Sequence, residues 1–196
     1  MILLTALALA VAWALLRGGR PSHLQSLSLQ GVTQVLIAFA LQAGVIYLPV
    51  ANSLGHPARV GLLIASYALA LWFIWANRKL PGMWLMGLGL LANWLVIVAN
   101  GGYMPVTFEA LEQASMTRLV NSTAPGTLVM GSKDVLLPLA ETRLSFLSDI
   151  FVLPPPFPVT GVFSVGDVLI AMGIFRFVPF ALGGHRNAPT NPRPAL

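Results

Sequence analysis

Five long apolar runs constrain this chain more than any other feature of its sequence. They cover about residues 1–17, 32–50, 60–77, 83–100 and 165–182. A helix of about 20 apolar residues crosses the hydrocarbon core of a bilayer. Hydrophobic residues make up 57% of the sequence and charged residues 9%, whereas a typical soluble domain is about 25% charged. We therefore predict an all-α polytopic membrane protein, a bundle of about five transmembrane helices.

The basic residues predict the orientation of these helices. The first run has no base before it, and Arg17 and Arg20 follow it directly, which is the reverse of a secretory signal peptide. If the N-terminus lies outside, Arg78 and Lys79 also fall on the cytoplasmic side, where bases are preferentially retained. We predict a multi-pass protein of the cell membrane with its N-terminus outside and its C-terminus in the cytoplasm.

The composition of the chain predicts its domain organisation, and its charge predicts its partners. Residues 1–184 are expected to form a single membrane domain, and residues 185–196, rich in Pro and Asn, a disordered cytoplasmic tail. The net charge of +5 comes largely from the cytoplasmic rim. Anionic lipid headgroups explain such a rim, so we expect membrane lipids as partners and no nucleic acid.

The connection over residues 101–163 is too long to be a simple loop, and we predict an ordered extracytoplasmic segment. Thr107 has the side chain of a helix N-cap, and an acid follows in the first turn. The apolar spacing over residues 139–151 predicts a second amphipathic helix. Both helices are expected to be short and interfacial. The prolines within residues 153–159 predict an extended approach to the last run.

Polar side chains inside the apolar runs are the first candidate sites. Asn93 and Asn100 are seven residues apart, so they share a helix face, and either line a polar cavity or bond to neighbouring helices. Ser164 and Asp167 either form a capping box or include a functional intramembrane acid. We favour the structural interpretation of both pairs.

The remaining candidates lie in the long connection. Gly101 and Gly102 follow Asn100 and either offer backbone amides to a ligand or form a helix C-cap and turn, which we favour. Asp134, Glu141 and Asp149 lie near Lys133 and Arg143 in the sequence. These charges form either an acid–base cluster or, as we favour, surface ion pairs.

No cofactor, metal site or catalytic residue is predicted. The sequence has no cysteine, which removes thiolate ligands and thiol nucleophiles. His23, His56 and His185 fall in connections or tails, and the predicted topology places His56 on the opposite side from the other two, so they do not make one metal site. We find no phosphate loop, zinc signature or nucleophile elbow.

Several short motifs resemble a bacterial family of polytopic membrane proteins catalogued as domain of unknown function 5317 (DUF5317). The resemblance implies this fold and a membrane location, and it implies no activity. It also makes Thr142, Arg143 and Asp149 candidates for contact with a ligand or partner. The motif residues are Asn100, Gly101, Gly102, Pro105, Thr142, Arg143, Leu144, Leu147, Asp149, Val162, Phe163, Ser164, Gly166, Asp167, Gly173 and Phe175.

These observations lead to three hypotheses about function. We expect a non-enzymatic accessory or scaffold protein that binds a partner protein or a lipid, with the long connection as its recognition surface. The alternative is a small transporter or lipid-processing enzyme with a polar cavity lined by Asn93, Asn100, Gln34 and Asp167. A third hypothesis is an accessory subunit of a larger bioenergetic membrane complex. A transporter or enzyme requires these polar side chains to line one water-accessible cavity. A scaffold requires them to be hydrogen-bonded to one another and shielded from water.

Overall fold

The computed structural model describes residues 2–48 and 54–183, and its five long helices coincide closely with the predicted runs. By length and hydropathy, α3 alone among the described helices is long and apolar enough to cross a membrane, and α1, α2 and α4 are shorter apolar helices. The predicted tail at residues 185–196 lies outside the described residues. The helices are α1 (Ile2–Leu16), α2 (Val32–Tyr47), α3 (His56–Ala76), α4 (Met83–Ala99) and α6 (Val165–Ala181).

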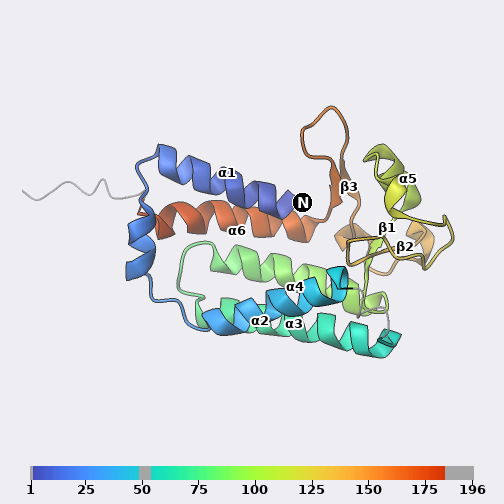
Figure 1. Cartoon of the computed structure of the whole chain (residues 1–196), viewed down its shortest axis with the longest axis horizontal. Helices are drawn as coiled ribbons and strands as arrows, with labels where there is room; N and C mark the ends of the chain where they lie inside the picture. The colour runs from blue at the N-terminus through green and yellow to red at the C-terminus, as the bar shows by residue number, and fades with distance from the viewer. Residues whose placement is uncertain (1, 49–53, 184–196) are drawn as a thin grey trace, which may run out of the picture.

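The long helices pack as an open chain of neighbours. The main contacts join α1 to α6, α6 to α4, α4 to α3 and α3 to α2 (Figure 1). Each helix therefore keeps apolar surface that no other long helix covers. Exposed examples are Leu4, Trp13, Leu36, Phe39, Trp72, Leu88 and Met172.

Four glycines allow α4 and α6 to pack backbone against backbone. Gly82 and Gly89 on the α4 side face Gly173 and Gly166 on the α6 side in antiparallel register. A Cβ atom on Gly173 would lie 2.8 Å from the carbonyl oxygen of Gly82, closer than any side chain tolerates. By contrast, a Cβ atom on Gly61 of α3 would have nothing within 4 Å.

Residues 101–163 fold into a small cap with two sheets and one short α-helix. Strands β1 (Met104–Val106) and β2 (Asp134–Leu136) pair in parallel, and β3 (Phe151–Leu153) pairs antiparallel with β4 (Gly161–Phe163). The protein is thus mostly helical, and the prediction of an all-α fold missed these strands. The buried centre of the cap consists of Val106, Ala110, Leu111, Val129 and Leu136.

The first predicted cap helix is present, and its packing differs from the prediction. Helix α5 (Phe108–Gln113) begins after Thr107, whose side chain accepts a hydrogen bond from the amide of Ala110 at 3.2 Å. Leu111 is fully buried in the core of the cap. The apolar face of α5 is therefore covered by the cap itself and is not free to lie on a bilayer. A 3₁₀ turn, η3 (Thr117–Leu119), follows.

Two predictions about the cap are wrong. Residues 139–151 form no amphipathic helix, because two 3₁₀ turns, η4 (Leu139–Glu141) and η5 (Ser145–Leu147), are separated by Leu144 in the left-handed region, at φ 53°. The proline-rich segment is not an extended approach to α6. It forms the connection that reverses the chain between the antiparallel strands β3 and β4, in which Phe151 pairs with Phe163.

The cap and the N-terminus lie together at one end of the row of helices (Figure 1). The opposite end carries the α1–α2 connection, which contains the 3₁₀ helix η1 (Pro21–Ser26), and the α3–α4 turn at residues 77–82. We call these two ends the cap end and the basic end. Asn77 joins the two connections, because its side chain donates to the carbonyl of Gln30 at 2.8 Å and accepts from its amide at 3.0 Å.

Candidate functional site

Asn93, Ser164 and Asp167 form one hydrogen-bonded cluster between α4 and α6. The side-chain amide of Asn93 donates to Asp167 Oδ1 at 2.9 Å, and the Ser164 hydroxyl donates to Asn93 Oδ1 at 2.9 Å. Ser164 and Asp167 also make the predicted capping box at the start of α6. Asn93 is 2% exposed and Ser164 is fully buried. Asn93 thus makes hydrogen bonds between the two helices, and Ser164 and Asp167 cap the start of α6.

The cluster depends on the glycine contact that lies beside it. A Cβ atom on Gly166 would overlap the side-chain oxygen of Asn93 and lie 2.7 Å from the carbonyl oxygen of Gly89. Only glycine at these positions lets α6 approach closely enough for the Asn93 hydrogen bonds to form. Gln34 does not join them, because it lies in the first turn of α2, whose main helix contact is with α3.

Asn100 ties the end of α4 to the cap. Its side-chain amide donates to the carbonyl of Arg143 at 2.8 Å and to the carbonyl of Val96 at 2.7 Å. Its side-chain oxygen accepts from the amide of Arg143 at 2.9 Å. The Asn100 side chain therefore bonds to both the amide and the carbonyl of Arg143, as the backbone of an adjacent strand would. Thr142 contributes locally, donating from its hydroxyl to the carbonyl of Pro138 at 3.0 Å.

Gly101 and Gly102 follow the C-cap residue Asn100 and form the turn that ends α4. Both have positive φ angles, 76° and 96°, which favour glycine. The amide of Gly102 donates back to the carbonyl of Ile97 at 2.8 Å, the bond that closes a helix end of the Schellman type. Val60 of α3 occupies the space that a Cβ atom on Gly102 would need.

The charged residues of the cap are more buried than surface ion pairs would be. Asp149 is 4% exposed and Asp134 is 8% exposed, so the prediction of surface ion pairs is wrong for these two acids. The Asp149 amide donates to the carbonyl of Pro105 at 3.2 Å, and the Lys133 carbonyl accepts from Met104 at 3.0 Å, which places both residues beside β1. Asp149 Oδ1 has no hydrogen-bond partner. Glu141 and Arg143 are exposed.

Burial changes the ionisation of this group. It raises the pKa of Asp149 well above its usual range, the nearby Asp134 raises it further, and Lys133 opposes both effects. Burial also raises the pKa of Asp134, which Lys133 again opposes. Burial alone would lower the pKa of Lys133, but Tyr67, Asp149 and Asp134 raise it overall. The cap thus keeps one cation among carboxyl groups that resist ionisation.

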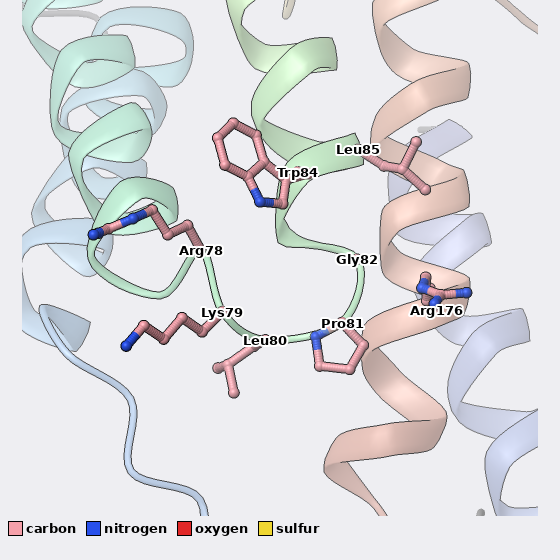
Figure 2. Close-up of a pocket in the computed structure, with 8 residues that line it drawn as sticks. All are labelled: Arg78, Lys79, Leu80, Pro81, Gly82, Trp84, Leu85 and Arg176. Carbon is pink, nitrogen blue, oxygen red and sulfur yellow. The ribbon is translucent and has the colours of Figure 1, made fainter.

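A pocket at the basic end was not predicted from the sequence. Figure 2 shows Arg78 and Lys79 from the α3–α4 turn, Trp84 and Leu85 from α4, and Arg176 from α6 around a cavity of about 580 Å³. Its lining includes no acidic side chain among the described residues. Arg176 is far from the turn in sequence, and the antiparallel packing of α4 on α6 brings it to the same pocket as the other two bases, on the opposite side from them in Figure 2.

An apolar groove of about 220 Å³ continues from this pocket along α3 and α4. Arg78 and Trp84 line both hollows. Trp75 and Trp84 meet edge to face, with ring centroids 6.3 Å apart. The guanidinium of Arg78 lies 4.5 Å from the Trp75 ring centroid and donates to the Trp75 carbonyl at 2.9 Å. The other lining residues of the groove are Leu71, Ile74, Gly87, Leu88 and Leu91.

Comparisons with known proteins agree with the resemblance seen in the sequence. An uncharacterised protein of Thermotoga maritima is 32% identical over 112 residues, and the match covers 56% of each chain. The chain therefore spans about half the length of this relative. No solved structure matches. The family model described as "Family of unknown function (DUF5317)" matches residues 26–179, and the chain therefore belongs to the DUF5317 family.

Proposed function

We propose that this protein is a non-enzymatic accessory or scaffold protein of the membrane that holds an anionic phospholipid at its basic end. The observation that carries the proposal is the junction of a basic pocket with an apolar groove at Arg78 and Trp84. A phospholipid has a matching arrangement, with a charged phosphodiester for the basic pocket and adjoining acyl chains for the apolar groove. Lys79 and Arg176 are exposed and free to meet the headgroup.

The charges around the pocket favour an anionic headgroup. Arg78, Lys79 and Arg176 supply three cations with no lining acid to offset them. Arginine suits phosphate because its planar guanidinium donates two parallel hydrogen bonds. The indoles of Trp75 and Trp84, which are 59% and 60% exposed, suit the boundary between headgroups and hydrocarbon.

The pairing of the intramembrane polar groups supports a scaffold over a transporter or lipid-processing enzyme. A polar cavity would need Asn93 and Asp167 to face water with free hydrogen-bonding groups. Instead, Asn93 binds both Asp167 and Ser164, and Asn100 binds the Arg143 backbone. These residues stabilise the packing of α4, α6 and the cap.

The proposal includes a topology. We place the five long helices across the bilayer as one membrane domain, with the N-terminus and the cap outside the cell and the basic end in the cytoplasm. Helix α1 has 15 residues, about 22 Å at 1.5 Å per residue, which is short of a hydrocarbon core about 30 Å thick. Local thinning of the bilayer accommodates such a helix at a modest cost.

The test measures which lipid stays bound to the purified protein. Nanodiscs with equal amounts of phosphatidylglycerol and phosphatidylcholine are extracted into a neutral detergent, and mass spectrometry counts the lipids retained. We expect wild-type protein to retain phosphatidylglycerol preferentially. Arg176→Gln should lower that preference about fivefold, because a base at the membrane surface contributes about 1 kcal/mol toward an anionic lipid.

The matched control is Arg118→Gln, because Arg118 is an exposed arginine of the cap, at the other end of the molecule. It changes the net charge equally and should leave the preference unchanged. Equal retention of the two lipids by wild-type protein would contradict the proposal. So would an equal loss of preference in the two variants.

The open chain of helices favours a second candidate, an accessory subunit of a larger membrane complex. Only 22% of the apolar stretch of α3 that could cross a membrane is buried inside the molecule. Much of this helix is therefore free to contact another chain or lipid. Small-residue or apolar faces of this kind pack against partner helices in membranes. Extraction from native membranes in a mild detergent should then yield a particle much larger than 20.9 kDa plus its detergent. A monomer under those conditions would exclude this candidate.

A further inference from the structure

A second cavity, at the cap end, is lined by Arg59, whose Nε has no hydrogen-bond partner among the described residues. The cavity has a volume of about 420 Å³ and lies between the start of α3, the end of α4 and the cap. Arg59 Nε is buried and has no hydrogen-bond partner. An unpaired buried donor costs roughly 1–3 kcal/mol, more when it is charged. The group is therefore poised to bind an acceptor that enters the cavity.

The neighbours of Arg59 leave it without a counter-charge. Its guanidinium carbon lies 6.0 Å from the ring centroid of Tyr103, at the outer limit of a cation–π contact. The lining includes no acid among the described residues. Asp134 is adjacent to the lining residue Val135, but successive side chains of a strand point to opposite faces. Asn100 also lines the cavity, and its amide is already engaged with Arg143 and Val96.

The other groups around the cavity favour a negative charge joined to an apolar body. His56 is an exposed residue of the lining, with its ring centroid 5.5 Å from that of Tyr103. Arg59 and His56 are both in the first turn of α3, where the helix dipole also favours an anion. Leu128, Val135 and Leu137 form an apolar wall.

We propose that this cavity binds a small amphiphilic oxyanion, a carboxylate or a phosphate monoester with a short apolar tail, held by the Arg59 guanidinium. The apolar tail lies against Leu128 and Leu137, and Tyr103 forms the side of the site. Gly101 and Gly126 also line the cavity, and a Cβ atom on either would meet nothing within 4 Å. This site lies at the opposite end of the molecule from the proposed phospholipid pocket and does not depend on it.

The test is isothermal titration calorimetry of the full chain in a neutral detergent. Three probes share one tail: hexanoate, hexyl phosphate and hexanol. We expect wild-type protein to bind at least one of the two anions at millimolar concentration and hexanol much more weakly. Binding of hexanoate alone or of hexyl phosphate alone would assign the oxyanion class. Equal binding of hexanol, or no binding of either anion, would overturn the proposal.

The variants assign the binding to Arg59. Arg59→Gln should weaken anion binding about tenfold or more, since a hydrogen bond to a charged group is lost. Arg59→Lys keeps the charge without the guanidinium and should have an intermediate effect. Arg118→Gln should bind as wild type does, and unchanged binding in Arg59→Gln would overturn the assignment.

Two further variants keep the test decisive. Leu137→Trp fills the cavity without touching the charge and should also abolish binding, which covers the case in which Arg59→Gln does not fold. Arg176→Gln should leave hexanoate and hexyl phosphate binding unchanged while it lowers phospholipid preference. The proposals for the two sites can therefore be supported or refuted independently.

Discussion

Replacement of Gly89 by alanine tests how strictly the packing of α4 on α6 depends on glycine. In most helices this change stabilises, because alanine has the higher helix propensity by about 1 kcal/mol. Here the new methyl group would overlap the carbonyl oxygen of Gly166 and lie 2.9 Å from the backbone nitrogen of Ile170. Both obstacles are backbone atoms, so α6 would have to move away by about 1 Å to restore ordinary contact distances.

That movement has two costs. Overpacking of this kind costs roughly 1–3 kcal/mol, and the Asn93 hydrogen bonds to Ser164 and Asp167, one turn away, would each lose up to about 1 kcal/mol. After the gain in helix propensity, we expect Gly89→Ala to lower the free energy of unfolding by about 2 kcal/mol.

The matched control is Gly61→Ala in α3, where the added methyl group meets nothing within 4 Å. This variant should gain about 1 kcal/mol, so the two substitutions are expected to have opposite signs. The assay is unfolding in mixed micelles with increasing dodecyl sulfate, followed by tryptophan fluorescence. A Gly89→Ala protein at least as stable as wild type would refute the reasoning.

Two more predictions concern the cap. Because burial holds the pKa of Asp149 above its usual value of 3.8, its favourable contribution is complete below that pH and is lost as the pH rises through the raised pKa. Asp149→Asn should therefore remove part of the decline in unfolding midpoint as the pH rises above 3.8, whereas Glu141→Gln, at an exposed acid, should not. The same slope in both variants would contradict this. Asn100→Ala should release the backbone at Arg143, so that trypsin cuts there faster while cutting at Arg118 is unchanged, and equal rates at Arg143 in wild type and variant would count against the proposed tie.

The long helices were predictable because their signals are local. Each apolar run ends at residues that stop a helix, such as Gly18 after α1 and Gly101 after α4, both at positive φ. The start of α3 was placed four residues late. The polar residues His56 and Arg59 belong to its first turn, where Pro57 is well tolerated because the first amides of a helix have no partner.

The cap was less predictable because its structure depends on distant partners. Strands of three residues are too short for an alternating pattern to be recognised, and the β1–β2 pair joins residues about 30 apart in the sequence. The apolar spacing over residues 139–151 predicted a helix, but the Asn100 side chain takes the hydrogen bonds of the Arg143 backbone. A tertiary contact therefore overrides the local preference.

The sequence indicated the candidate residues more readily than their arrangement in space. The capping motif of Ser164 and Asp167 was visible in the sequence, but Asn93 as their common partner was not, since it lies on another helix. The seven-residue spacing of Gly82 with Gly89, and of Gly166 with Gly173, was a signal for this contact that went unused. The buried state of Asp149 had no sequence signal, because charged residues of a connection are usually exposed.

The topology of the chain is tested most directly by labelling single cysteines in intact cells. The sequence has no cysteine, so each introduced thiol is the only one in the protein. Thr123→Cys in the cap and Gln25→Cys in η1 both replace exposed residues, at opposite ends of the molecule. With a membrane-impermeant maleimide, we expect Thr123→Cys to be labelled in intact cells and Gln25→Cys only after the membrane is opened. Labelling of Gln25→Cys in intact cells, or protection of Thr123→Cys, would contradict a membrane-spanning row of helices with its cap outside and its basic end in the cytoplasm.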